Sequence, residues 1–222
     1  MTETAAASTR RPDVRLLGVI PKKWVDGFVN SLARLSDILV RLDISPNFIT
    51  FLALLAGLAA GALFAFRHPG WAVVLIFVCG ALDVIDGKVA VKSKKQSLYG
   101  AIFDSTLDRY SEFFIYFGLA YYFRGRWPMW IPYFTFLGST MVSYTRARAE
   151  GLGIECKAGF MQRAERMILL VLGSLIGTIF KVFDPAMIAV LTAIAVISNI
   201  TAIERTLLVR KIERLRNKDK EV

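Results

Sequence analysis

The sequence is poor in the residues that build disulfide, thiolate and histidine sites. It has only two cysteines, Cys79 and Cys156, which are far apart and lie in different kinds of segment, and one histidine, His68. Two such cysteines provide neither a disulfide framework nor a metal-binding pattern. His68 stands beside Pro69 in an expected short turn, where we interpret it as a surface residue and not as a ligand.

The chain also lacks any stretch suited to a separate soluble domain. Residues 1–21 are predicted to be a disordered cytoplasmic tail, because residues 1–13 are small and polar and have no apolar centre of the kind that a signal peptide needs. Of the 222 residues, 55% are hydrophobic, and they fall in long runs. A bilayer span needs about 20 apolar residues, so the length accommodates roughly six spans and little else.

An amphipathic segment precedes the apolar ones. Residues 22–45 are predicted to form an amphipathic juxtamembrane helix on the membrane surface, because Trp24, Phe28 and Leu32 recur at helical spacing between polar residues. Pro46 then offers a helix start. The six expected spans run roughly over residues 48–66, 71–91, 100–123, 128–149, 160–181 and 185–208.

The predicted fold class is therefore an all-α integral membrane protein, with six transmembrane helices preceded by an N-terminal amphipathic interfacial helix. The six-helix domain is expected over residues 46–209, and residues 210–222 are expected to be a basic cytoplasmic tail.

Positive charge supports this topology. The chain has 28 lysines and arginines against 18 acidic residues, for a net charge of +10, but its basic residues form no continuous patch interleaved with aromatics. We therefore expect membrane lipids and no nucleic acid as partners. If the N-terminus is cytoplasmic, nearly all basic residues outside the spans fall on the cytoplasmic side, and the exceptions are Arg67, Arg124, Arg126 and Lys181. This asymmetry predicts that both termini lie on the cytoplasmic side of the cell membrane.

Four aspartates stand where a membrane protein should avoid charge. Asp83 and Asp86 close the second expected span, and Asp104 and Asp108 open the third. Spacings of three and four place each pair on one helix face, and both pairs lie at the same membrane side. Gathering four carboxylates requires neutralising cations, and hard oxygen ligands select Mg²⁺, Mn²⁺ or Ca²⁺. The alternative is that the aspartates only pair with nearby lysines and Arg109.

The segment from Asp83 to Asp108 reads DVIDGKVAVKSKKQSLYGAIFDSTLD. It resembles the signature of the CDP-alcohol phosphotransferase family, D-x2-D-G-x2-A-R-x8-G-x3-D-x3-D. Every gap length is kept, and the matching residues are Asp83, Asp86, Gly87, Ala90, Gly100, Asp104 and Asp108. One position departs from it, because Val91 stands where the family has arginine. The adjacent Lys92 could supply the missing charge, although helix geometry turns it by about 100°.

The resemblance implies a homodimeric six-helix enzyme of phospholipid biosynthesis that cleaves a CDP-linked lipid. A small alcohol acceptor attacks the phosphate nearest the lipid, and CMP leaves. The resemblance assigns Asp83, Asp86, Asp104 and Asp108 as ligands of Mg²⁺ or Mn²⁺, as two ions, with Asp108 also the general base. The CDP contacts are then expected from Asp83, Gly87, Ala90, Lys92 and Gly100.

The acceptor is expected to be inositol phosphate. The segments SYTRARAEGLG and GFMQRAER, which start at Ser143 and Gly159, resemble the phosphatidylinositol-phosphate synthase branch of the family. In that branch, basic residues at the positions of Arg146, Arg166 and Arg205 bind the acceptor phosphate, although lysine is common where this chain has Arg146. The alternative is that these arginines only flank the membrane spans.

Other readings stay open from the sequence. The same reaction could use glycerol 3-phosphate, inositol or serine as acceptor. More distant alternatives are an intramembrane prenyltransferase, which also uses aspartates with Mg²⁺, and a cation transporter or channel with the aspartates as the ion site.

Overall fold

The computed structural model describes residues 22–154, 156 and 161–218. The predicted tail of residues 1–21, the end of the basic tail at 219–222 and Gly159 lie outside the described residues. The described elements are α1 (Lys22–Arg41), α2 (Pro46–Ala65), α3 (Pro69–Lys92), α4 (Leu98–Tyr122), the short 3-10 helix η1 (Trp127–Trp130), α5 (Ile131–Gly151), α6 (Arg163–Ile179) and α7 (Phe183–Lys218). All regular structure in these ranges is helical, so the predicted all-helical class is confirmed.

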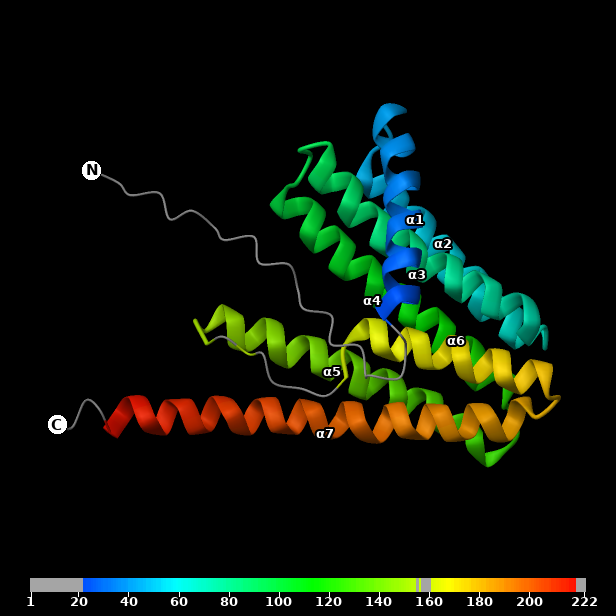
Figure 1. Ribbon diagram of the computed structural model, residues 1–222. Coiled ribbons are helices and arrows are strands. Elements are labelled where there is room, and N and C mark those ends of the chain that lie inside the picture. Colours follow the sequence, from blue (N-terminus) through cyan, green and yellow to red (C-terminus); the bar gives the residue numbers. More distant parts are fainter. Residues whose placement is uncertain (1–21, 155, 157–160, 219–222) are drawn as a thin grey trace.

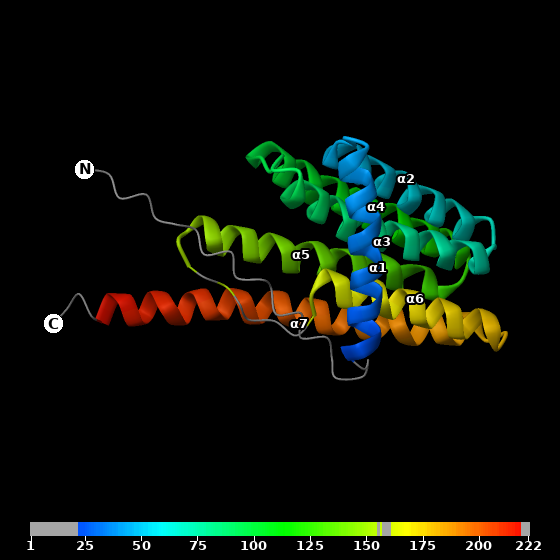
Figure 2. The ribbon, with the colours of Figure 1, turned by 45° about the horizontal axis from the view of Figure 1, so that its top comes forward.

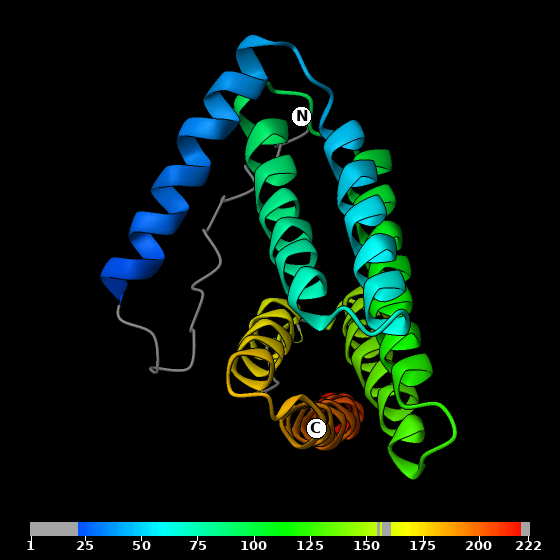
Figure 3. The ribbon, with the colours of Figure 1, turned by 90° about the vertical axis from the view of Figure 1, so that its right-hand side faces the viewer.

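Helices α2 to α7 form two groups of three that pack on each other. One group is α2, α3 and α4, and the other is α5, α6 and α7 (Figures 1 and 3). Contacts of α3 with α6 and of α4 with α5 join the two groups. One apolar core, which includes Phe64, Leu119, Leu170 and Leu191, runs through both groups.

Helix α1 lies outside both groups, to one side of α3 (Figure 3), and crosses the other helices at a steep angle in the views of Figures 1 and 2. It packs on α3, where Leu32 joins the buried residues Ile85 and Val89 in a small apolar cluster. Two ion pairs also connect this region to the end of α3 and the following turn. Lys92 Nζ lies 2.6 Å from Asp37 Oδ1, and Lys95 Nζ lies 2.5 Å from Asp43 Oδ1.

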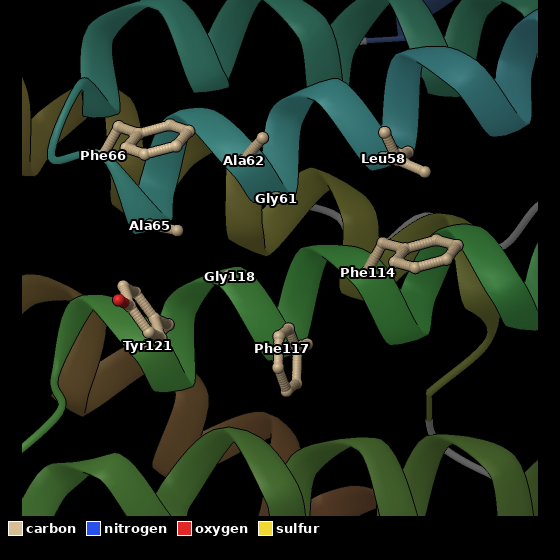
Figure 4. Close-up of a pocket in the computed structure, with 9 residues that line it drawn as sticks. All are labelled: Leu58, Gly61, Ala62, Ala65, Phe66, Phe114, Phe117, Gly118 and Tyr121. Carbon is tan, nitrogen blue, oxygen red and sulfur yellow. The ribbon is translucent and has the colours of Figure 1, made fainter.

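Small residues allow α2 and α4 to pack backbone to backbone. A Cβ added to Gly61 would collide with the backbone of Phe114, and one added to Gly118 would collide with the backbone of Gly61. Such close approach is typical of helices packed within membranes. An apolar pocket lies beside this crossing, and none of the nine residues that line it is charged (Figure 4).

Within the described part of the chain, two helices have the length and apolar composition of a membrane span, namely α2 and the Phe183–Leu215 part of α7. The other helices that follow the expected spans are shorter or carry charge. Helix α6 has 17 residues, while α3 and α4 carry the aspartates of the candidate site. The six-span topology and the surface position of α1 therefore stay predictions.

Candidate active site

The turn between α3 and α4 positions the acidic residues. Helix α3 ends at Lys92, Lys94 adopts a left-handed conformation with φ of 56°, and α4 begins at Leu98. The Ser97 side chain caps α4 by accepting a 2.9 Å hydrogen bond from the Gly100 backbone N–H. This short connection brings the last turns of α3 beside the first turns of α4, and so brings Asp83 near Asp104 and Asp108.

Three of the four predicted aspartates come together. Asp83, Asp104 and Asp108 each offer one carboxylate oxygen, and these oxygens lie within 4.8 Å of one another. Asp104 Oδ1 is buried and has no hydrogen-bond partner among the described residues. An all-oxygen donor set with an unused buried acceptor fits a hard divalent cation such as Mg²⁺ or Mn²⁺.

Asp86, the fourth aspartate, is anchored to α2. Its side chain is 5% exposed, and Oδ2 accepts a 2.7 Å hydrogen bond from Thr50 Oγ1. Asp86 interacts electrostatically with both Asp83 and Asp104, so it belongs to the same acidic region. It lies outside the three-carboxylate group itself.

Arg163 is the main protein cation at this group, and it begins α6. Its NH1 donates to Asp83 Oδ1 at 2.6 Å and lies 2.8 Å from Asp108 Oδ2. Arg109 NH1 lies 3.5 Å from the same Asp108 oxygen. The expected pairing of the aspartates with Arg109 is thus observed for Asp108, but Arg163, which sequence reasoning did not place here, makes the shorter contacts.

A second buried ion pair lies one helical turn beyond Asp108. Glu112 Oε1 accepts a 2.8 Å hydrogen bond from Arg166 NH2, and both side chains are 1% exposed. Glu112 Oε1 also lies 3.8 Å from Arg163 Nε. The sequence prediction missed Glu112, although it continues the four-residue spacing of Asp104 and Asp108 along α4.

The predicted CDP-contact positions lie along the end of α3 and the start of α4. Gly87 faces open space, because a Cβ added there would meet nothing within 4 Å. Gly100 packs more tightly, and its added Cβ would lie 3.1 Å from Ser97 Oγ. Ala90 is partly buried beside the exposed Val91. Lys92 donates to Asp37 Oδ1 at 2.6 Å and to the Ala33 carbonyl at 3.1 Å, so its ammonium group has partners on α1.

The three predicted acceptor-binding arginines lie on three different helices. Arg166 is buried, and its Nε has no hydrogen-bond partner within the described part of the chain. Arg205, 5% exposed on α7, donates to the Val142 carbonyl at 2.5 Å. Arg146, exposed on α5, donates to Glu150 at 2.8 Å. Arg205 interacts electrostatically with both Arg146 and Arg166, so the three guanidinium groups lie close enough to affect one another.

Comparisons with known proteins agree with this arrangement. The family model described as CDP-alcohol phosphatidyltransferase matches residues 43–203. The chain is 35% identical over 169 residues to the archaetidylinositol phosphate synthase of Methanothermobacter thermautotrophicus, which covers 76% of this chain and 85% of that relative.

The fold is also similar to crystal structures of the phosphatidylinositol phosphate synthase of Mycobacterium tuberculosis. The structure with CDP-DAG bound has a TM-score of 0.73 and 27% sequence identity, and covers 80% of this chain and 92% of that one. The structure in complex with manganese and citrate has a TM-score of 0.73 and 26% identity, and covers 80% of this chain and 88% of that one.

Proposed function

This chain belongs to the CDP-alcohol phosphatidyltransferase family, and on that premise we propose that it transfers the lipid phosphoryl group of a CDP-linked lipid to inositol phosphate and releases CMP. The observation that carries the proposal is the group of Asp83, Asp104 and Asp108, whose carboxylate oxygens lie within 4.8 Å of one another. Arg163 lies beside this group, with NH1 2.6 Å from Asp83 Oδ1 and 2.8 Å from Asp108 Oδ2. The prenyltransferase and transporter alternatives are set aside by the family match.

The cofactor is Mg²⁺ or Mn²⁺, in keeping with the oxygen donor set and with the manganese complex of the related synthase. We propose that Asp83, Asp104 and Asp108, with Asp86 beside them, hold two ions. When bound, the metal polarises the diphosphate and stabilises the leaving oxyanion.

Asp108 is the proposed general base. It accepts the proton of the acceptor hydroxyl, whose oxygen attacks the phosphorus nearest the lipid. The bond between that phosphorus and the CMP oxygen breaks, and CMP carries away the electron pair. Asp108 suits this role because its side chain is only 13% exposed and belongs to the carboxylate group.

Arg146, Arg166 and Arg205 are proposed to bind the phosphate of the acceptor. Arg205 interacts electrostatically with the two other guanidinium groups, and this like-charge repulsion would be relieved by a phosphate dianion between them. A phosphorylated acceptor is therefore favoured over free inositol or serine, and glycerol 3-phosphate ranks second.

The proposed CDP contacts follow the family signature along Asp83, Gly87, Ala90 and Gly100. Open space above Gly87 supports this placement, because a bulky ligand can approach the backbone there. Lys92 was expected to replace the charge missing at Val91, but its bonds to α1 support a role in holding that helix.

We also propose six spans with the site on the cytoplasmic side and α1 along the membrane surface. Exposed aromatic residues gather at the helix ends opposite the aspartates, as in the aromatic belt of a membrane interface. These residues are Phe66, Trp71, Trp127, Trp130 and Phe180. A homodimer, which the family resemblance implies, completes the proposed assembly.

Initial rates of CMP release test the proposed function. The purified full-length enzyme is given a CDP-linked lipid, Mn²⁺ and, in separate reactions, inositol phosphate, glycerol 3-phosphate, inositol or serine. We expect inositol phosphate to react fastest. Faster reaction with free inositol or serine would contradict the acceptor assignment and leave the reaction class intact.

A further inference from the structure

Arg163 lies between two sets of carboxylates. On one side its NH1 contacts Asp83 Oδ1 at 2.6 Å and Asp108 Oδ2 at 2.8 Å. On the other side its Nε lies 3.8 Å from Glu112 Oε1. The Glu112 side chain is 1% exposed, and that of Arg163 is 17% exposed. One guanidinium group thus spans from the proposed metal ligands to a buried glutamate.

The contact between Arg163 and Glu112 is incomplete. Arg163 Nε is a buried donor and Glu112 Oε2 is a buried acceptor, and neither has a hydrogen-bond partner among residues 22–154, 156 and 161–218. A shift of about 1 Å would bring the two side chains to the separation of a charge-assisted hydrogen bond. The pair is therefore placed to form a bond that the present arrangement leaves unmade.

Arg163 and a divalent cation bound at the proposed metal site would compete for the same two carboxylates. Asp83 and Asp108 supply two of the three carboxylates of the proposed metal site, and both are engaged by Arg163 NH1. A guanidinium group displaced from a partly buried pair needs another anion, because an uncompensated charge there is strongly unfavourable. Glu112, with Oε1 3.8 Å from Arg163 Nε, is a carboxylate outside the three-aspartate group that lies within reach.

We propose that Glu112 is the alternative partner of Arg163, which transfers its hydrogen bonds from Asp83 and Asp108 to Glu112 when a divalent cation binds the three aspartates. Glu112 is then a positioning residue. It lowers the free-energy cost of binding the metal, because Arg163 keeps an anionic partner. Arg163 and Arg166 then both bind the Glu112 carboxylate, at the end of the site proposed for the acceptor phosphate. This inference rests on the metal site of the proposed function.

A double-mutant cycle on metal binding tests the proposal without turnover. The dissociation constant of Mn²⁺ is measured by electron paramagnetic resonance on the purified full-length chain, for the wild type, Glu112→Gln, Arg163→Gln and the double variant. We expect Arg163→Gln to tighten Mn²⁺ binding, because a competing cation is removed. Glu112→Gln should weaken it by about five- to tenfold, and by less than about twofold when Arg163 is already Gln.

Two controls separate this role from general electrostatics and from misfolding. Glu165→Gln removes a negative charge from the start of α6, where Glu165 accepts a hydrogen bond from the Gln162 backbone, and should leave Mn²⁺ affinity unchanged. Glu112→Asp keeps the charge and should recover part of the affinity lost in Glu112→Gln, which keeps the proposal testable if Glu112→Gln is poorly folded.

Equal weakening by Glu112→Gln in both Arg163 backgrounds would overturn the proposal, since the glutamate would then act through space and not through Arg163. Unchanged Mn²⁺ affinity in a folded Glu112→Gln variant would overturn it as well. Either result would leave the transferase activity itself in place. A wild-type chain that binds no Mn²⁺ would instead contradict the metal site of the proposed function.

Discussion

Thr50 on α2 donates a 2.7 Å hydrogen bond to Asp86 on α3, and this bond joins the acidic region to the neighbouring helix. The Asp86 side chain is buried, so the Thr50 hydroxyl supplies the hydrogen bond that water would donate to an exposed carboxylate oxygen. Replacing a residue that orients a metal-binding carboxylate in this way typically lowers metal affinity or activity by about ten- to a hundredfold.

Replacing Thr50 should therefore lower the affinity for the metal, although Thr50 is not itself a proposed ligand. In Thr50→Val the Asp86 oxygen loses its donor, and we expect the Mn²⁺ concentration for half-maximal activity to rise about tenfold. Thr50→Ser keeps the hydroxyl and is the matched control. Equal Mn²⁺ dependence of Thr50→Val and the wild type would show that the bond does not orient Asp86 for metal binding.

Asp108→Asn tests whether Asp108 is the proposed general base in addition to a proposed metal ligand. Asparagine is nearly the same size but cannot take the hydroxyl proton, so the turnover rate should fall by about 10²-fold or more. Binding of the CDP-linked lipid, measured by calorimetry with Mn²⁺ present, should persist because three aspartates remain. A loss of lipid binding as large as that of Asp83→Asn would make Asp108 simply another ligand.

Arg146 allows the clearest test of the acceptor site, because it is exposed and its removal disturbs no buried pair. Arg146→Ala should raise the Michaelis constant for inositol phosphate by about ten- to a hundredfold, the cost of one charge-assisted hydrogen bond. The Michaelis constant for the CDP-linked lipid should hardly change. Arg148→Ala, also exposed on α5, is the control, and an equal effect there would indicate general surface charge.

Lys92 and Asp37 form an ion pair at 2.6 Å with half-exposed side chains. We expect Lys92→Ala and Asp37→Asn to lower stability by a similar small amount, up to about 1 kcal/mol, in thermal unfolding. Neither should change the Michaelis constant for the CDP-linked lipid. A rise confined to Lys92→Ala would restore the nucleotide contact first expected for this residue.

The helices and the group of three carboxylates could be predicted because their signals are local. Long apolar runs interrupted by prolines predicted the approximate limits of α2 to α6 and the start of α7. Helix α7 continues to Lys218, through the first part of the segment expected to be a basic tail. The spacing of Asp83, Asp104 and Asp108 around one short connection predicted that they meet, since antiparallel helices joined by a tight turn must bring those ends together.

The partners of these residues depend on tertiary packing and could not be predicted. Arg163 reaches Asp83 across 80 positions of the chain, and Arg166 reaches Glu112 across 54. From the sequence, Arg163 looked like a flanking charge at the start of an apolar segment, and Arg166 was expected to bind the acceptor phosphate and not a glutamate. The contact of Lys92 with Asp37 likewise depends on how α1 packs on α3, which no spacing within either helix specifies.

The most direct test of the central claim is the phosphorus composition of the lipid product. The purified enzyme is incubated with a CDP-linked lipid, inositol phosphate and Mn²⁺, and the extracted lipid is examined by ³¹P nuclear magnetic resonance while CMP is quantified. We predict one phosphodiester and one phosphomonoester in the product for each CMP released, and no product when excess EDTA replaces Mn²⁺. A product without the monoester, or full turnover in EDTA, would contradict the account.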